Sequence, residues 1–180
     1  MATPVVVANA IKYQPFGPLK NIKYGNNLQL SRTYDLDGRL ATQTIAGKQN
    51  LLYDYDVLNN IKDIADPIDP TRGEVYTYDV LNRLGTATGK YGAISYEYDE
   101  VGNRTQQTID RGGLLTTETY HYPLTSNRLD QIDIWAGAGP AKERKFIYDN
   151  AGNLVDETRA DGTHRRFSYD KTNRMESVTP

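Results

Sequence analysis

The chain has 180 residues, with 21 basic and 23 acidic side chains, a net charge of −2 and 38% hydrophobic residues. This balanced charge gives no electrostatic reason to expect nucleic acid as a partner, and no apolar run is long enough to span a membrane. The absence of cysteine excludes a disulfide framework and a cysteine-based metal site, and the length fits one domain.

The first residues differ from the rest of the chain. Met1–Ala10 contains a short valine patch at 5–7 but no basic region before it, so we expect no signal peptide in this chain. We interpret residues 1–23 as a leading strand segment. A repeat array of about seven units is predicted to follow at 24–175.

From residue 34 onward a tyrosine recurs, and in most copies an aspartate follows it. The tyrosines are Tyr34, Tyr55, Tyr78, Tyr98, Tyr122, Tyr148 and Tyr169, with steps of 21, 23, 20, 24, 26 and 21 residues. A period of this kind is typical of a protein built by stacking one small unit.

Each unit is predicted to open with a strand that carries aromatic side chains on one face. Six of the seven tyrosines have an aromatic residue two positions earlier: Tyr53, Tyr76, Tyr96, Tyr120, Phe146 and Phe167. A spacing of two places both rings on the same side of a strand. Because the residues between them are mostly polar, we expect the aromatic face to point to a core and the other face to water.

A turn is predicted after each tyrosine. Its aspartate can accept a hydrogen bond from the backbone N–H two residues on, and a glycine or asparagine can supply the positive φ of a tight turn. The residues expected to carry this structural repeat are Tyr34, Asp35, Gly38, Tyr55, Asp56, Tyr78, Asp79, Asn82, Tyr98, Asp99, Gly102, Tyr122, Tyr148, Asp149, Gly152, Tyr169, Asp170 and Asn173.

A second strand and a second turn complete the predicted unit, and no stretch favours a long helix. The second strands include 103–108 and 154–159. The second turns are expected at Gly47, Gly89, Asp110–Gly113, Gly137–Pro140 and Asp161-Gly162. Ile61–Gly73 is irregular and contains two prolines, so we expect a loop inserted between strands.

Several residues invite a functional interpretation, and each also has a structural one. Asp35 and Asp37 resemble the start of a calcium loop, but the rest of such a loop is missing, which favours turn capping. The Asp63–Asp69 cluster could hold a hard cation, but a solvated loop is the favoured interpretation. His121 is expected to face solvent and His164 follows an Asp-Gly turn, and neither has metal-ligand or nucleophile-base spacing. We therefore predict no catalytic residue, no metal site and no cofactor.

Two further sets remain open. Trp135 and Tyr91 fall outside the aromatic pattern and are the candidates for stacking on a sugar. Four arginines follow the repeated asparagine and are expected to pair with acidic residues of the next unit or to stack on the tyrosines. They are Arg83, Arg104, Arg128 and Arg174.

With these motifs in place, the chain resembles the Rhs/YD-repeat family. The matching forms are Tyr-Asp-x-x-Gly-Asn-Arg at 98–104 and Tyr-Asp-x-Leu-Asn-Arg-Leu at 78–84, together with the leading segment 11–26. The resemblance implies a β-strand spiral that forms a hollow shell. In bacterial polymorphic toxins, and in the C components of insecticidal toxin complexes, such a shell encloses a toxic domain. Teneurins use a related shell in adhesion.

The resulting prediction is an all-β fold, a spiral of antiparallel β-hairpins forming part of a shell wall. The expected role is enclosure of a toxin or effector domain by a non-catalytic segment of a longer, secreted or cell-surface protein. The expected partners are flanking repeats or further copies of the chain, and the enclosed domain. A glycan-binding adhesion module is the alternative, and an enzyme would need a cleft of convergent titratable groups.

Overall fold

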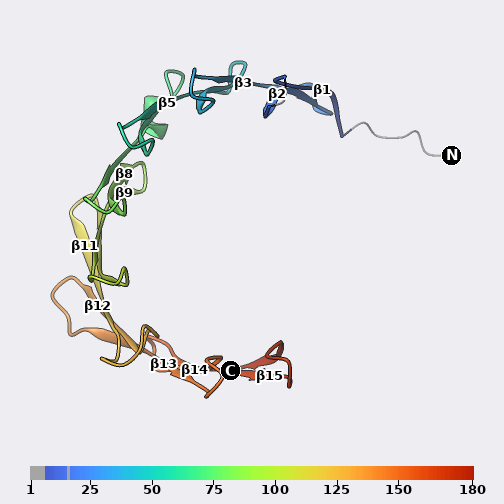
Figure 1. The fold of residues 1–180 in the computed structure, drawn as a ribbon. Helices are drawn as coiled ribbons and strands as arrows, with labels where there is room; N and C mark the ends of the chain where they lie inside the picture. Colours follow the sequence, from blue (N-terminus) through green and yellow to red (C-terminus); the bar gives the residue numbers. More distant parts are fainter. Residues whose placement is uncertain (1–6, 16) are drawn as a thin grey trace. The chain divides into compact units, whose positions relative to one another are not determined.

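The structure, a computed structural model, describes residues 7–15 and 17–180. Two of the three valines considered for a signal peptide, Val5 and Val6, and also Phe16 of the leading segment, lie outside the described residues. The chain divides into two units, Met1–Tyr91 and Gly92–Pro180. In each unit the strands follow one another in the sheet in chain order, and each pairs with its neighbour in antiparallel fashion (Figure 1).

The first unit contains eight strands and one short 3-10 turn in its described residues. They are β1 Ala8–Tyr13, β2 Leu19–Tyr24, β3 Gln29–Tyr34, β4 Leu40–Ile45, β5 Gln49–Tyr55, β6 Ile61–Ala65, η1 Pro70–Arg72, β7 Glu74–Tyr78 and β8 Leu84–Gly89. The repeated tyrosines end β3, β5 and β7, as the sequence pattern predicts.

The second unit contains eight more strands. They are β9 Gly92–Tyr98, β10 Arg104–Arg111, β11 Leu114–His121, β12 Gln131–Ala136, β13 Lys142–Tyr148, β14 Leu154–Thr158, β15 His164–Tyr169 and β16 Met175–Thr179. The prediction of an all-β chain of antiparallel hairpins is confirmed, and the described residues contain no α-helix. In the described part of the chain, no helix is long and apolar enough to cross a membrane.

The hairpins share one register feature at the repeated tyrosine. Tyr34 pairs with Leu40, Tyr55 with Ile61 and Tyr78 with Leu84. In each hairpin the register shifts just before that pair. A bulge bends a strand and redirects the side chain beside it. The tyrosine ring therefore leaves the regular pleat at the end of its strand.

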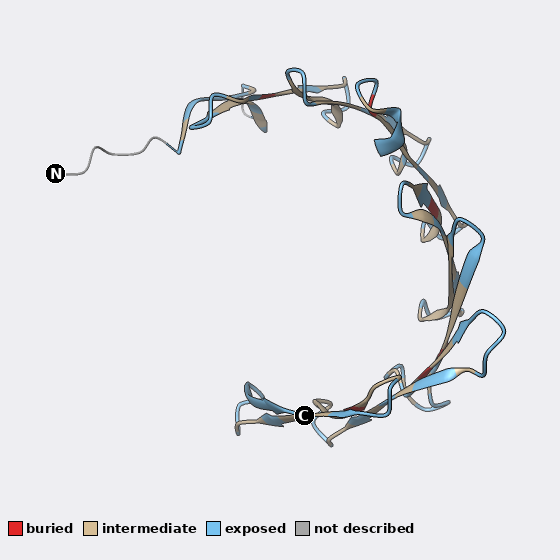
Figure 2. Ribbon diagram, turned by 180° about the vertical axis from the view of Figure 1, so that it is seen from behind, coloured by how far each residue is buried: buried red, intermediate tan, exposed pale blue. Residues whose placement is uncertain are grey.

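The aromatic residues share one face, but that face does not close into a core. Along β7, β9 and β13 the aromatic positions are half-buried and the alternating positions are exposed. Buried apolar residues are few among those described: Leu30 and Ala87 in the first unit, Tyr120 and Ile132 in the second (Figure 2). The predicted alternation is confirmed, and the aromatic positions of these strands are half-buried rather than enclosed.

The predicted loop at Ile61–Gly73 begins later than expected. Its first five residues form β6, in which Ile61 pairs with Tyr55 and Ile64 with Tyr53. Both prolines fall after the strand, at positions 67 and 70, where no ladder hydrogen bond is needed. The irregular segment is therefore residues 66–73.

The residue at the start of that segment is also not solvated as predicted. Asp66 is only 2% exposed, and its carboxylate accepts hydrogen bonds from the backbone N–H groups of Asn50 at 3.2 Å and Ile68 at 3.0 Å. Arg72 lies 3.5 Å from its second oxygen. Asp66 thus attaches the loop to β5, and Asp69 caps the 3-10 turn by accepting from Thr71.

The turn predicted at Gly89 lies slightly further along the chain. Gly89 ends β8, and the turn is formed by Lys90 and Tyr91 before Gly92, whose φ is +104°. A Cβ atom on Gly92 would lie 2.0 Å from the carbonyl oxygen of Asp110. Only glycine fits this position, because both the dihedral angle and the neighbouring backbone exclude a side chain.

Replacing this glycine should destabilise the fold strongly. For Gly92→Ala we expect a loss of about 2 kcal/mol or more in the free energy of unfolding, since strained backbone alone costs about 1–3 kcal/mol. Urea unfolding followed by circular dichroism measures the change. Gly139→Ala is the matched control, because no atom lies within 4 Å of its added Cβ, and it should stay within about 0.5 kcal/mol of the parent. Equal stability of the two variants would contradict the prediction.

Candidate functional site

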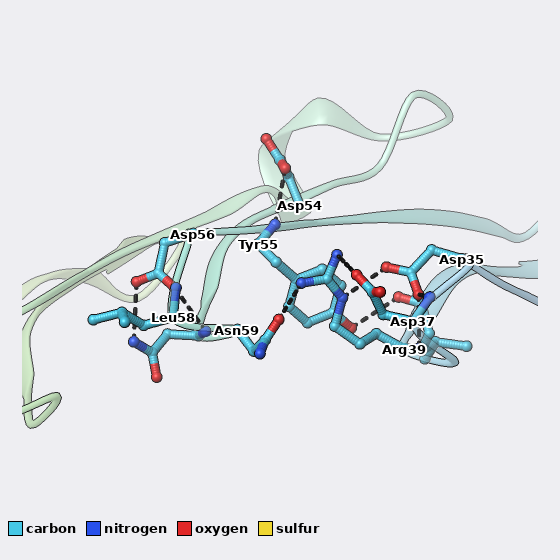
Figure 3. Close-up of polar contacts among 10 residues, drawn as sticks. Asp35, Asp37, Arg39, Asp54, Tyr55, Asp56, Leu58 and Asn59 are labelled. Carbon is cyan, nitrogen blue, oxygen red and sulfur yellow. Dashed lines mark hydrogen bonds and ion pairs between the residues drawn. The ribbon is translucent and has the colours of Figure 1, made fainter.

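The most regular chemical feature of the chain is the turn that follows each repeated tyrosine, which we call the Tyr-Asp turn. In its first copy, one carboxylate oxygen of Asp35 accepts from the backbone N–H groups of Asp37 at 3.0 Å and Arg39 at 2.8 Å. The other oxygen accepts from Nε of Arg39 at 2.7 Å (Figure 3). One side chain therefore satisfies three donors of a five-residue turn.

The same arrangement returns in both units, at every repeated tyrosine that an aspartate follows. The first oxygen of the aspartate accepts from the backbone N–H four residues on, at Arg39, Asn60, Arg83, Asn103, Asn153 and Arg174. The side chain of that same residue donates to the second oxygen. The sequence predicted the bond from the backbone N–H two residues on. It did not predict the backbone and side-chain bonds from the residue four positions on. The alternation of arginine and asparagine at the fourth position was the available signal, since both carry the required N–H.

The position three residues after the aspartate explains why glycine and asparagine exchange there. Its φ is positive in each copy: 77° at Gly38, 95° at Gly102 and 91° at Gly152. Asparagine takes 69° at position 59, 61° at position 82 and 59° at position 173. Both residue types tolerate this left-handed region, and the predicted substitution is confirmed.

The turn hydrogen bonds hold the pKa of the aspartates low. At Asp170 the hydroxyl of Thr172 and the backbone N–H of Arg174 are the largest causes, and the pKa falls to about 2. At Asp56 the side-chain amide of Asn60 is the largest cause of the lowered pKa, and at Asp79 it is the backbone N–H of Arg83. Each carboxylate is therefore a turn anchor that remains ionised rather than a proton donor near neutral pH.

The hydroxyl groups of four repeated tyrosines link their repeat to the preceding one. Tyr34 donates to the carbonyl of Leu19 at 2.7 Å, Tyr55 to Leu40 at 2.9 Å and Tyr78 to Ile61 at 2.8 Å. In the second unit Tyr122 donates to Arg104 at 3.1 Å. In these four copies the accepting residue opens the strand that follows the preceding turn, so the hydroxyl joins neighbouring hairpins.

The bond from Tyr34 to Leu19 points to a further copy of the repeat, at Tyr13, which the sequence pattern did not show. Leu19 stands six residues after Tyr13, as Leu40 does after Tyr34, and Tyr13 pairs with Leu19 as Tyr34 pairs with Leu40. Tyr13 lies 21 residues before Tyr34, which is the spacing of the repeat. Because no aspartate follows Tyr13, the pair used to find the motif is absent there.

A second link, a hydrogen bond between side chains, joins the Tyr-Asp turn of one repeat to that of the next. Asn60 donates to the side-chain oxygen of Asn82 at 3.1 Å, and Asn153 donates to that of Asn173 at 3.0 Å. Arg39 donates to the side chain of Asn59 in the same way (Figure 3). The accepting asparagines occupy the positive-φ position of the next turn, so backbone geometry and turn-to-turn contact depend on one residue.

The four arginines that follow the repeated asparagine either stack on an aromatic ring or pair with an acidic residue. Arg104 lies over the ring of Tyr120 at 4.4 Å and Arg128 over that of Tyr148 at 5.9 Å, which confirms the stacking. Arg83 and Arg174 form ion pairs with the aspartate of their own turn. The reason is geometric: four residues after the aspartate, the turn has brought the arginine back beside it.

The remaining candidates do not come together as a reactive site. The exposed His121 contacts Asp133 at 2.8 Å, and His164 contacts Asp156 at 2.9 Å, each across neighbouring strands. Asp35 and Asp37 share Arg39. Within the described ranges, no three acidic or histidine residues are grouped as metal ligands. Trp135 is half exposed on β12, and Tyr91 lies in the turn after β8.

Comparison with known proteins agrees with this architecture. Residues 148–180 match the family described as RHS Repeat. The chain is 32% identical over 147 residues to toxin protein Tse5 of Pseudomonas aeruginosa, which covers 71% of this chain and 11% of Tse5. It is 30% identical over 156 residues to human teneurin-4, covering 86% of this chain and 5% of that protein. The chain thus spans a small part of each relative.

Solved structures show the same fold. The Photorhabdus luminescens Tc holotoxin pore, with its TccC3 component, matches with a TM-score of 0.51 at 17% identity, over 93% of this chain and 12% of the other. The crystal structure of TcdB2-TccC3 matches with a TM-score of 0.53 at 15% identity, over 91% and 12%. The expected resemblance to Rhs/YD-repeat proteins and the predicted fold class are both confirmed.

The hydroxyl link between hairpins should contribute measurably to stability. For Tyr78→Phe, which removes the bond to Ile61, we expect a loss of about 0.5–1.5 kcal/mol, the net value of one hydrogen bond. Tyr13→Phe is the control, because that side chain is 64% exposed. Urea unfolding of both variants gives the comparison, and an unchanged Tyr78→Phe midpoint would count against the link.

Acid should weaken the Tyr-Asp turns. An aspartate has a pKa of about 3.9 in an unfolded chain, whereas that of Asp170 is about 2 in the fold. Its contribution is fully present above the unfolded value and is lost as the pH falls through the folded one. We therefore expect the melting temperature to fall between about pH 4 and pH 2.

Two variants separate this effect from general charge repulsion. Asp170→Asn should make the fall in melting temperature shallower over that range. Glu100→Gln, at an exposed turn position, removes the same charge without touching an anchor and should leave the slope as in the parent. Identical slopes in both variants would refute the assignment.

Proposed function

We propose that this chain, an RHS-repeat segment related to Tse5 and teneurin-4, forms part of the wall of a shell that encloses a toxin or effector domain. The observation that carries this proposal is the repeated link from a tyrosine hydroxyl to the preceding hairpin. A link that depends only on the preceding unit can be repeated without limit along a sheet. Such a unit is suited to building extended surface.

The polar groups of the repeat support a structural role rather than catalysis. The aspartates anchor turns, the asparagines join turns, and the tyrosine hydroxyls bind backbone carbonyls. These groups are already used by the fold, whereas an enzyme needs a cleft with titratable groups that converge on a substrate. We therefore assign the segment no catalytic residue and no cofactor.

Further strands are the proposed partners at the ends of the sheet. All five residues of β16 are exposed, and β1 is exposed along most of its length. An open strand edge recruits another strand. Flanking repeats of a longer secreted or cell-surface protein would satisfy these edges, and a further copy of the chain could do so in isolation.

A chimera tests enclosure directly. The stretch of Tse5 that matches this chain over 147 residues is replaced by the corresponding part of this chain, and a second Tse5 variant has that stretch deleted. We expect the chimera to resist limited proteolysis as the parent Tse5 does, because the wall remains continuous. The deletion variant should be cleaved readily. A chimera as sensitive as the deletion variant would contradict the role as a wall segment.

A glycan-binding adhesion module is the alternative, favoured by the half-exposed Trp135 on β12. Aromatic faces in such positions suit sugar rings. A glycan array probed with the purified chain distinguishes the two roles, with Trp135→Ala as the control. A wall segment should bind no glycan specifically, whereas specific binding that Trp135→Ala removes would establish the alternative.

A further inference from the structure

One surface of the second unit departs from the pattern of the repeat. A groove of about 460 Å³ lies across the start of β13, the end of β14 and the turn into β15. We call it the basic groove. Four cations line it, Lys142, Arg144, Arg159 and Arg165, against two carboxylates, Glu157 and Asp161. This local excess of positive charge occurs in a chain whose net charge is −2.

Strand register explains why these charges gather. Phe146 pairs with Glu157, and Glu157 pairs with Arg165, so the three side chains share one face across three strands. Lys142 and Arg144 lie four and two residues before Phe146, and therefore point to that same face. The groove thus continues the aromatic face towards the ends of the strands remote from the Tyr-Asp turns.

A buried acid holds two of the arginines in place. Glu157 is 7% exposed, and it accepts from Nη2 of Arg144 at 2.5 Å while Arg165 lies 3.8 Å from its other oxygen. The two guanidinium groups remain partly exposed, at 37% and 42% of their side chains. Their remaining N–H donors are therefore presented to the groove in fixed positions.

Two other repeats have a glutamate and a tyrosine at the positions where β13 and β15 have an arginine and a phenylalanine. Glu74 accepts from the hydroxyl of Tyr76, and Glu118 accepts from that of Tyr120. In β13 and β15 the aromatic residue is phenylalanine, which has no hydroxyl, and the residue two positions earlier is Arg144 or Arg165. An arginine in place of the glutamate therefore loses no such bond in β13 and β15, and it places a cation on each of the two strands that flank β14.

We propose that the basic groove binds an acidic segment of a polypeptide. The arginines already bind one carboxylate, that of Glu157, and a forked guanidinium suits further carboxylates. No aromatic side chain lines the groove, so it offers no stacking platform for a nucleic-acid base or a sugar ring. Lys142 and Arg159 form no ion pair within the described residues and supply the additional charge. This site does not depend on the proposed enclosing role.

Binding of fluorescein-labelled hexaglutamate to the full chain, followed by fluorescence anisotropy, tests the proposal. The double variant Lys142→Gln/Arg159→Gln should weaken binding about tenfold, the equivalent of two exposed ion pairs. Its melting temperature should match the parent, because Glu157 and its two arginines are retained. Lys12→Gln/Lys20→Gln is the matched control, since it removes two exposed cations of the first unit and should leave affinity unchanged.

Each other outcome overturns the proposal. An absence of hexaglutamate binding refutes the site, and equal losses in the two double variants indicate general charge attraction instead. A heparin oligosaccharide and an oligothymidylate serve as competing probes. If either binds more tightly than hexaglutamate and loses affinity only in the groove variant, the groove recognises a different class of polyanion.

Discussion

The architecture depends on one interaction, the capture of turn N–H groups by the aspartate of each Tyr-Asp turn. Because Asp35 accepts from the backbone two and four residues on, the turn closes with a fixed length. That length sets the register shift at the strand end, which redirects the ring of the tyrosine. Once redirected, the hydroxyl meets the carbonyl that opens the preceding strand. In these copies the polar contact of the turn and the join to the neighbouring repeat occur together, whereas Tyr122, which no aspartate follows, makes the hydroxyl link to Arg104 without it.

This way of joining units explains how a chain with few buried residues keeps an extended sheet. Each described unit is a single layer, and the aromatic residues of β7 and β13 are half-buried rather than enclosed (Figure 2). The backbone ladder, the hydroxyl links and the turn-to-turn amide contacts hold neighbouring strands. Stability therefore accumulates from one unit to the next, as in other repeat proteins.

Residues that depart from the repeat are more informative about function than those that keep it. The repeated tyrosines and aspartates are used by the fold. Asp66, buried in the irregular loop, attaches that loop to β5 and is likewise structural. Arg144 and Arg165, in contrast, occupy positions where other repeats have an apolar residue or a glutamate that accepts from a tyrosine hydroxyl. Both arginines pair with the buried Glu157, and their side chains remain partly exposed beside the groove.

The sequence by itself determined the spacing of the repeat, the aromatic and polar faces of its strands, and the equivalence of glycine and asparagine in the turn. These features follow from side-chain alternation and local dihedral preference. The sequence did not determine that Ile61–Ala65 is a strand or that Tyr13 belongs to the array, because two prolines follow that strand closely and no aspartate follows Tyr13. Only the tertiary structure showed that Tyr78 binds Ile61 and that Glu157 orders two arginines. These contacts join different strands, and their partners are set by register, which a one-residue shift would change completely.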